Sequence, residues 1–219
     1  MGSPETFEKN NYVVARNLLD PYLVQFLASY AKSVREGQAG EFARDTTSLN
    51  SHGDACSDVV LYSLRSKIEE LTGLELMPTY SFTRIYQNGD KVGRHKDGPQ
   101  NQVSCSMCVA RDEVDWPLGF SDGKTEGQVV MEPGDGVIYR GHMLDHWREK
   151  FEGNNQVQII AGYVVKDGRF DGHRFYGRGE PTYQAKGLRP ISSVRKVKGI
   201  LYRTFDSYRR KYWEARSKR

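Results

Sequence analysis

The sequence has little cysteine. Three of its 219 residues are cysteines, Cys56, Cys105 and Cys108. A small and odd number fits a reducing compartment better than a disulfide framework. Cys105 and Cys108 form a C-x-x-C pair, but no second pair completes a zinc site. We therefore interpret them as half-buried thiols of a strand, on which positions i and i+3 face opposite sides.

Long apolar runs are also absent. No run approaches the roughly 20 residues that a membrane-spanning helix needs. The first residues, MGSPETFEKNN, have neither the basic nor the apolar region of a signal peptide. We therefore expect a soluble, cytoplasmic protein with no membrane span. With 37% hydrophobic and 11% aromatic residues, the chain is too apolar to be disordered and can build a core.

The C-terminal part has few acidic residues. From residue 166 onward there are 16 Lys and Arg against 5 Asp and Glu, whereas the first 165 residues have 16 against 23. We expect a folded domain over residues 1–165 and a basic extension over residues 166–219. Ser192 or Ser193 is the predicted N-cap of an amphipathic helix that runs to about Ser217. Three roles stay open for this helix: packing on the domain, forming a dimer, or contacting nucleic acid or an acidic partner.

Two helices are predicted in the first third of the chain. Asp20 is an N-cap residue, and apolar positions at helical spacing predict a helix from Pro21 to about Glu36. A second apolar stripe predicts a helix from about Ser57 to Thr72. The segment between them, Gln38 to Ala55, has no sustained period and is predicted to be a surface loop.

The rest of the domain consists of short β-rich runs separated by glycine, asparagine and aspartate. Helices followed by about seven such strands predict a mainly β fold with flanking helices, as a sheet sandwich or a barrel. Asn88–Gly89 is a tight-turn signal, and it predicts that the strands on either side pair as antiparallel neighbours. That pairing would bring Tyr86 close to His95. Pro133–Gly136 is a second turn, and it starts a strand that leads toward His146.

One group of residues has the composition of a metal site. His95 and Asp97 are two residues apart, so in an extended strand both side chains point to the same face. A histidine from another strand would complete a set of two histidines and one carboxylate, which holds Fe(II) on one face and leaves the opposite positions open. His146 and His142 are the candidates for this third ligand. The alternative interpretation is that His95 and Asp97 are an exposed polar pair and that His146 is a core histidine.

The ordered motifs resemble a known family. They are R-x-Y-x-x-G from Arg84, H-x-D from His95, P-G-D from Pro133, and H-W-R-E from His146 followed by an aliphatic strand. This pattern resembles the Fe(II)/2-oxoglutarate-dependent dioxygenases of the prolyl 4-hydroxylase-like branch, in particular small members from phages and bacteria. The resemblance extends over about Asn11 to Val165, most firmly from Met77 onward.

The resemblance implies a fold, a reaction and a ligand set. The fold is a double-stranded β-helix, also called a jelly roll, and the iron ligands are His95, Asp97 and His146. The co-substrate is 2-oxoglutarate, and the usual reaction hydroxylates a C–H bond with release of succinate and CO2. The carboxylate of Asp97 favours hydroxylation, because related halogenases lack it. The substrate is a peptidyl residue or a small molecule that the sequence does not identify.

The chain departs from the family where the distal carboxylate of 2-oxoglutarate binds. Prolyl-hydroxylase-like enzymes commonly have Lys or Arg about ten residues after the distal histidine, and here that residue is Gln156. A buried carboxylate without a cation is costly, so another base is expected. Arg148 is the first candidate. The other candidate residues are Arg84, Arg94, Tyr86 as a hydroxyl donor, and Gln156 with Gln158 on one face of their strand.

A second function class stays open because of Gln156. The chain could be a non-catalytic jelly-roll binding module, which has lost use of the co-substrate and contacts nucleic acid or an acidic partner through its basic extension. Binding and turnover of 2-oxoglutarate distinguish the two classes.

Overall fold

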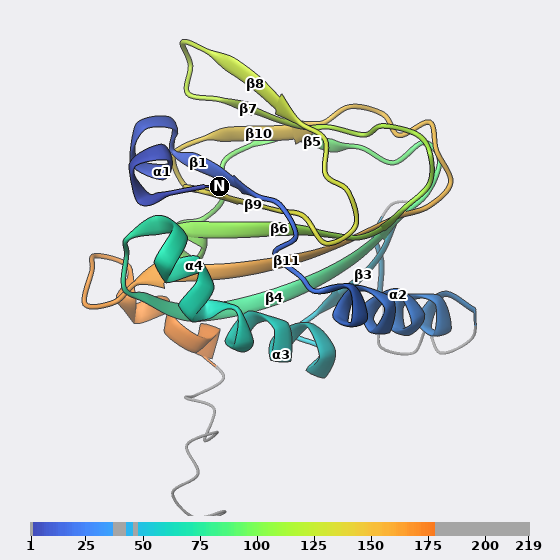
Figure 1. The fold of residues 1–219 in the computed structure, drawn as a ribbon, viewed down its shortest axis with the longest axis horizontal. Coiled ribbons are helices and arrows are strands. Elements are labelled where there is room, and N and C mark those ends of the chain that lie inside the picture. The colour runs from blue at the N-terminus through green and yellow to red at the C-terminus, as the bar shows by residue number, and fades with distance from the viewer. Residues whose placement is uncertain (1, 37–42, 46–47, 178–219) are drawn as a thin grey trace, which may run out of the picture. The chain divides into compact units, whose positions relative to one another are not determined.

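The computed structural model describes residues 2–36, 43–45 and 48–177. Two antiparallel sheets lie face to face, and helices cover the outer face of the larger sheet (Figure 1). In sheet order, the seven-stranded sheet contains β1 (Tyr12–Ala15), β9 (Gly136–Tyr139), β6 (Val103–Arg111), β11 (Gln156–Val165), β4 (Leu76–Tyr86), β3 (Ser48–His52) and β2 (Ala43–Asp45). The four-stranded sheet contains β5 (Val92–His95), β10 (Asp145–Arg148), β7 (Leu118–Ser121) and β8 (Glu126–Val129).

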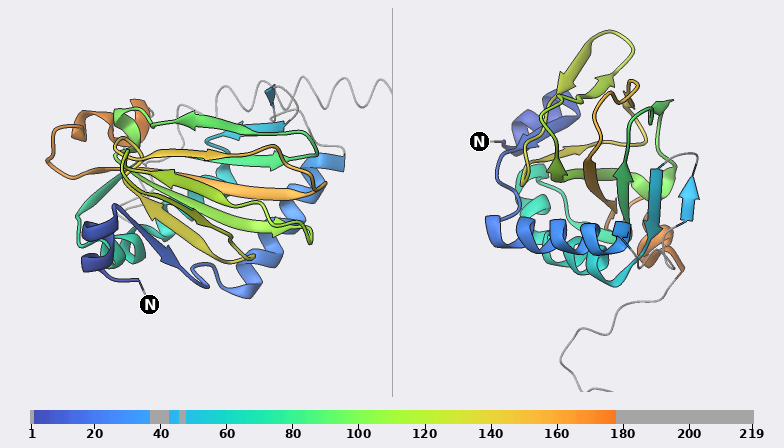
Figure 2. Two further views of the ribbon diagram at one scale, coloured as in Figure 1. Left: turned by 90° about the horizontal axis from the view of Figure 1, so that it is seen from above. Right: turned by 90° about the vertical axis from the view of Figure 1, so that its right-hand side faces the viewer.

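The helices lie in the first part of the chain. They are α1 (Pro4–Asn10), α2 (Pro21–Glu36), α3 (Ala55–Ser63) and α4 (Arg65–Thr72). Short 3₁₀ helices follow β5 and β11, namely η2 (Pro99–Asn101) and η3 (Asp171–Gly177). Figure 2 shows α2 running across the strands of the large sheet, on the side away from the small sheet. The predicted class, mainly β with flanking helices and a jelly-roll core, is confirmed.

Side chains of the central strands alternate between two faces of the large sheet, an apolar face toward the helices and a more polar face toward the small sheet. The residues of β11 that face the helices belong to the main hydrophobic core: Val157, Ile159, Ala161 and Tyr163. Gln156 and Gln158, which alternate with them, face the space between the sheets and are also buried. Each fully buried aliphatic or aromatic side chain of the apolar face contributes roughly 1.5–3 kcal/mol. The apolar face therefore stabilises the fold, and the polar face is available for a site.

The helix predictions need two corrections. The helix Pro21–Glu36 is confirmed. The predicted helix Ser57–Thr72 is divided at Leu64, whose ψ of −7° departs from the helical value, and the apolar stripe continues through the break. The helix α1 was not predicted. It begins after the N-cap Ser3 and buries a single side chain, Phe7.

Two of the predicted connections differ from the structure. The segment Gln38–Ala55 contains β2 and β3, and β3 extends the large sheet by pairing with β4. The Asn88–Gly89 turn does not form a hairpin, because β4 and β5 belong to different sheets. Instead, the Gly89 N–H donates to the carbonyl of Phe151, and the Phe151 N–H donates to that of Asp90, at 2.8 and 2.7 Å. The turn therefore crosses from one sheet to the other.

The second predicted turn is present at Pro133–Gly136. Gly134 adopts a φ of 98°, which favours glycine. The Asp135 carboxylate accepts hydrogen bonds from Arg16 and from the N–H groups of Asn17 and Glu132, at 2.6–3.0 Å. These bonds tie the turn to the segment that follows β1.

The described chain continues past Val165. The helix η3 packs against β4 and β11, and Phe170 just before it lies 5.8 Å, between ring centroids, from His142. The predicted helix from Ser192 or Ser193 to Ser217 lies outside the described residues. Among the helices that are described, none is long and apolar enough to cross a membrane.

Candidate metal and co-substrate site

The structure brings three predicted ligands together. His95 ends β5, His146 lies opposite it on β10, and Asp97 follows β5 by two residues. The Asp97 Oδ1 atom lies 3.7 Å from His95 Nε2 and 3.6 Å from His146 Nε2. One potential ligand atom from each residue lies within 4.8 Å of the other two, and among the described residues no other such group could hold a metal ion. Strand pairing between β5 and β10 therefore builds the cluster.

Hydrogen bonds orient the two imidazoles for metal binding. His95 Nδ1 lies 2.7 Å from the carbonyl oxygen of Gly93, and His146 Nδ1 lies 3.1 Å from that of Leu144. A carbonyl only accepts, so each Nδ1 carries a proton, and Nε2 is the nitrogen of each ring that faces Asp97 and would bind a metal. Two imidazole nitrogens and one carboxylate oxygen are the donor set of a facial Fe(II) site, and the residues present fit that ion.

Asp97 is held in its charged form. Burial raises the pKa of its carboxyl group, but hydrogen bonding and charge interaction with His146, together with Ser104, lower the pKa by more. Ser104 Oγ donates to Asp97 Oδ2 at 2.7 Å, and the Asp97 N–H donates to the Gly141 carbonyl at 2.8 Å. These contacts leave Oδ1 for the metal.

His142, the competing third ligand, lies elsewhere. Its Nδ1 is 3.0 Å from the carbonyl oxygen of Gln102, and its ring faces Phe170. It does not belong to the group of three among the described residues. The geometry favours His146.

Arg148 lies two residues after His146, on the same buried face of β10. Two residues along a strand span about 7 Å. The side chain is 4% exposed, and burial lowers the pKa of its guanidinium group. No carboxylate within the described part of the chain pairs with it, and its NH2 atom has no hydrogen-bond partner there. A buried guanidinium with a free donor is costly, and an anion would offset that cost.

Two other predicted co-substrate residues, Tyr86 and Gln156, lie in the neighbourhood of Arg148, and Arg84 lies beside Tyr86. Tyr86 is buried, and desolvation raises the pKa of its hydroxyl group although Arg84 and Arg148 lower it. The Arg84 guanidinium lies 5.1 Å from the centroid of the Tyr86 ring. Gln156 Nε2 lies 3.6 Å from the sulfur of Cys108, whose pKa burial raises to about 11 although Arg148 lowers it.

Arg94 is the candidate that the structure moves away from this site. It stacks on Trp147, 4.3 Å from the ring centroid, and forms an ion pair with Glu126 at 2.8 Å. Trp147 alternates with His146 and Arg148 on β10, so Arg94 lies on the opposite face of the small sheet.

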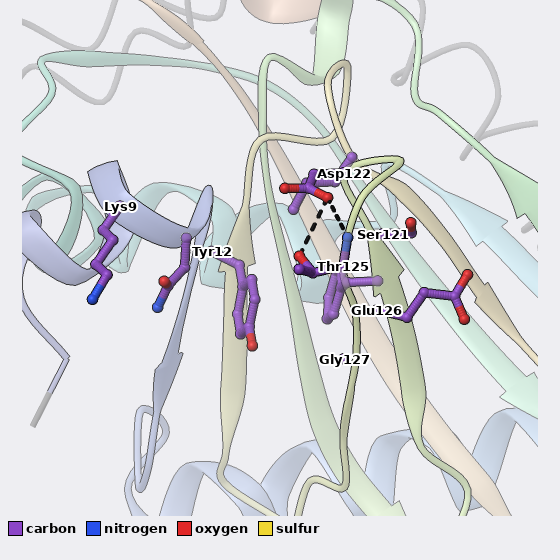
Figure 3. Close-up of a pocket in the computed structure, with 10 residues that line it drawn as sticks. Lys9, Tyr12, Ser121, Asp122, Thr125, Glu126 and Gly127 are labelled. Atoms are coloured by element: carbon purple, nitrogen blue, oxygen red, sulfur yellow. Dashed lines mark hydrogen bonds between the residues drawn. The ribbon is translucent and has the colours of Figure 1, made fainter.

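A surface hollow of about 200 Å³ lies between α1 and the β7–β8 hairpin. Lys9, Tyr12 and Asp122 are among its lining residues (Figure 3), whereas the three ligands and Arg148 are not. Asp122 accepts from the N–H groups of Lys124 and Thr125, both at 2.8 Å. The Asp122 carboxylate is thus bonded within the hairpin, and the metal cluster with Arg148 remains the better candidate site.

Comparison with known proteins supports the fold. No protein-family model and no curated protein matches the chain. A prolyl-4-hydroxylase from Pseudomonas putida is similar in structure, with a TM-score of 0.60 and 17% identity over 74% of this chain and 96% of that one. An oxidoreductase of the 2OG-Fe(II) oxygenase family from Burkholderia pseudomallei has a TM-score of 0.62 and 12% identity, over 77% and 91%. The epimerase SnoN, solved with Fe3+, alpha-ketoglutarate and nogalamycin RO, has a TM-score of 0.61 and 11% identity, over 73% and 80%.

The fold is that of the Fe(II)/2-oxoglutarate oxygenases. Within this oxygenase fold, the candidate site occupies the space between the two sheets. The sequence motifs predicted the three ligand positions and Arg148, and the structure places them on neighbouring elements. It also reveals two residues that the sequence did not indicate: Ser104 beside Asp97, and Trp116 beside Arg148. Alternation along β6 would have found Ser104, but no local pattern would have found Trp116.

Gln158 adds a second unsatisfied donor to the interior of the oxygenase fold. Its Oε1 accepts from Ser106 Oγ at 3.2 Å, and its Nε2 is buried with no partner among the described residues. Gln158 is two residues from Gln156 on the same face of β11. The interior therefore offers both an amide donor and a guanidinium donor to a bound anion.

Proposed function

We propose that the protein is an Fe(II)- and 2-oxoglutarate-dependent oxygenase that hydroxylates a C–H bond of a peptidyl residue or a small molecule. The observation that carries the proposal is Arg148, a buried guanidinium with no carboxylate partner among the described residues, on the same strand face as His146. A metal cluster alone would suit many ions. A metal cluster with an anion site about 7 Å along the strand suits a 2-oxo acid with a second carboxylate.

In this proposal, His95, Asp97 and His146 hold the iron. Bound iron with 2-oxoglutarate and dioxygen supplies the oxidising chemistry, in which the co-substrate leaves as succinate and CO2. Ser104 keeps one oxygen of Asp97 occupied, so that the other faces the metal. The carbonyls of Gly93 and Leu144 fix the imidazole tautomers.

The remaining residues bind and orient the co-substrate. Arg148 pairs with its distal carboxylate through NH2, which has no partner among the described residues. Tyr86 and Cys108, the neighbour of Gln156, both lie within the charge influence of Arg148. Trp116 and Phe151, both buried, exclude water from this end. Exclusion of water strengthens the ion pair because the local dielectric constant is low. A cation on β10 thus replaces the one that the resemblance predicted on β11.

The test is anaerobic binding of Fe(II) and 2-oxoglutarate, followed by succinate release after oxygen is admitted. We expect both ligands to bind the wild-type protein and succinate to form. His146→Ala should abolish the metal-dependent signals, and His142→Ala should keep them. Wild-type protein that fails to bind 2-oxoglutarate would contradict the proposal, and loss of binding in His142→Ala alone would reassign the third ligand.

A non-catalytic binding module is the other class that the sequence left open. Its basic extension lies outside the described residues, and no described contact favours it. The proposed substrate class follows the similar structures, which include a prolyl-4-hydroxylase and an epimerase in complex with nogalamycin RO.

A further inference from the structure

Trp116 contacts Arg148 in two ways. Its backbone carbonyl accepts a hydrogen bond from Arg148 NH1. Its indole ring lies against the guanidinium, with the Arg148 Cζ atom 4.7 Å from the ring centroid, within the range of a cation–π contact. One nitrogen of the guanidinium is therefore occupied and one face is covered, whereas NH2 stays without a partner among the described residues.

Trp116 is itself fixed from several directions. Its Nε1–H donates to the carbonyl of Glu149 at 2.7 Å. Its ring packs between Tyr86 and Phe151, with centroid distances of 4.8 and 4.7 Å, and the residue is 5% exposed. An indole with two aromatic ring contacts and one hydrogen bond has little rotational freedom, so it is a rigid support for the guanidinium.

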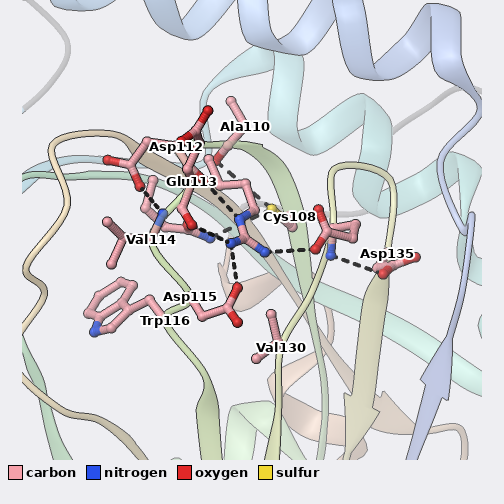
Figure 4. Close-up of polar contacts among 12 residues, drawn as sticks. Cys108, Ala110, Asp112, Glu113, Val114, Asp115, Trp116, Val130 and Asp135 are labelled. Atoms are coloured by element: carbon pink, nitrogen blue, oxygen red, sulfur yellow. Dashed lines mark hydrogen bonds and ion pairs between the residues drawn. The ribbon is translucent and has the colours of Figure 1, made fainter.

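The loop before Trp116 is anchored at both ends (Figure 4). Arg111, the last residue of β6, donates to Asp115 at 2.5 Å and to Glu132 at 2.7 Å. Asp112 accepts from the N–H groups of Val114 and Asn155, both at 3.1 Å, and from that of Asn154. Asp112 and Asp115 thus make their contacts within the loop and its neighbours. These contacts anchor the backbone that leads into Trp116.

We infer that Trp116 is a positioning residue for the co-substrate: it holds the Arg148 guanidinium so that NH2 faces the distal carboxylate of 2-oxoglutarate. This inference rests on the proposed function. An arginine side chain that is free to change rotamer loses conformational entropy when it binds a carboxylate. A guanidinium that is fixed beforehand avoids this cost and binds the carboxylate more tightly. Trp116 acts through Arg148 and not on the reacting atoms, so its removal should change the affinity for one part of the co-substrate only.

The experiment measures dissociation constants of the full chain by calorimetry without oxygen: Fe(II) is titrated into metal-free protein, and 2-oxoglutarate and pyruvate are titrated into Fe(II)-loaded protein. In Trp116→Leu, the dissociation constant of 2-oxoglutarate should rise about tenfold, in line with the loss of a desolvated cation–π contact. The dissociation constant of Fe(II) should stay within twofold of that of the wild type. Pyruvate, a 2-oxo acid without the distal carboxylate, should bind both proteins equally. Val114→Ala, an exposed position in the same loop, is the matched control and should bind all three ligands like the wild type.

A double-mutant cycle separates positioning from general disruption. If Trp116 acts through Arg148, adding Trp116→Leu to Arg148→Gln should cause no further loss of 2-oxoglutarate affinity. Equal losses in the two backgrounds would overturn the inference, as would weaker binding of Fe(II) and pyruvate together with 2-oxoglutarate.

A second variant covers the case in which Trp116→Leu does not fold. Trp116→Phe keeps an aromatic ring and the backbone carbonyl, and loses the hydrogen bond to Glu149. It should raise the 2-oxoglutarate dissociation constant by about threefold, because phenylalanine is a weaker cation–π partner than tryptophan. If Trp116→Leu does not fold, an unchanged 2-oxoglutarate dissociation constant in Trp116→Phe would overturn the inference. Failure of the wild type to bind 2-oxoglutarate is a different result, and it would contradict the proposed function instead.

Discussion

Gly141 is the residue that leaves room for the metal-binding carboxylate. A Cβ atom at this position would meet Asp97 Oδ2 inside van der Waals contact, and would lie 2.7 Å from Ser104 Oγ. Its carbonyl also accepts the Asp97 N–H. A single methyl group here would therefore displace the carboxylate.

We predict that Gly141→Ala weakens Fe(II) binding by at least tenfold, since the displaced Asp97 can no longer face both imidazoles. Anaerobic titration with Fe(II) measures the effect. Gly172→Ala is the matched control, because a Cβ atom there has open space. Wild-type affinity in Gly141→Ala would show that Asp97 tolerates the shift or is not a ligand.

The positive charge of Arg148 on β10 can be moved by mutation to position 156 on β11. Arg148→Gln removes a hydrogen bond to a charged group, worth about 1.5–3 kcal/mol, so the KM for 2-oxoglutarate should rise by roughly 10- to 100-fold. Adding Gln156→Arg should restore part of the loss, because Gln156 and Arg148 both lie beside Cys108. Succinate assays over a range of 2-oxoglutarate concentrations measure both. No recovery in the double variant would mean that β11 does not reach the carboxylate.

Individual site residues could be predicted where they belong to one sequence motif or to one strand. The H-x-D and H-W-R-E motifs indicated His95, Asp97, His146 and Arg148. Arg94 could have been rejected, because it is adjacent to His95 on a strand and so faces the other side. Trp116 could not be predicted, since it meets Arg148 only through the folding of a loop 32 residues away.

Among the elements, the Pro133–Gly136 turn is held by one side chain, Asp135. Burial raises the pKa of Asp135, but the hydrogen bond from Arg16 and those from the N–H groups of Asn17 and Glu132 lower it by more, and the net pKa is lowered. A lowered carboxyl pKa stabilises the fold above the ordinary value near 3.9, and this stabilisation is lost as the pH falls through the folded-state pKa.

We predict that Asp135→Asn lowers the free energy of unfolding by about 1–3 kcal/mol at pH 7, because a neutral amide has one acceptor oxygen for three donors. The difference from the wild type should begin to shrink below about pH 4, where the unfolded state binds a proton at Asp135, and should be lost as the pH falls through the lowered folded-state pKa. Urea unfolding at pH 7 and pH 3 checks both statements. An equal difference at the two pH values would mean that the carboxylate charge is not responsible.

Elements were predictable where a local signal controls them. The helix Pro21–Glu36 has a cap residue, a first-turn proline and an apolar stripe, and it was found in full. The break at Leu64 was not found, because the stripe has the same spacing on both sides. Likewise β3 carries no alternation. It exists because the edge of β4 offers it hydrogen bonds, and that edge appears only when the sheet forms.

For the whole molecule, the proposed ligands should act as stabilisers. A ligand at 100 times its dissociation constant adds about 2.7 kcal/mol to the stability of the folded state. For a domain of this size that corresponds to a rise in Tm of roughly 5–10 °C. We predict this shift for Fe(II) with 2-oxoglutarate in a thermal melt without oxygen, and a much smaller one in His146→Ala. Equal shifts in both proteins would place the binding elsewhere.

The site should also be independent of the C-terminal extension. Every residue assigned to the metal and the co-substrate lies before residue 178. We therefore predict that a chain ending at Gly177 binds Fe(II) and 2-oxoglutarate with the affinities of the full chain, as calorimetry would measure. A large loss on truncation would assign the extension a role in the site.

The position of β5 has a consequence for how the metal leaves. β5 is an edge strand of the small sheet as described, and the His95 side chain on it is 45% exposed, against 5% for His146. Edge segments of this kind open far more often than the whole domain unfolds. Opening of β5 alone would release one of the three ligands, while β10 keeps His146 in place. The rate at which a chelator removes the ion should then be set by the opening of β5 alone. Amide protons on β5 should also exchange with solvent faster than those on β10.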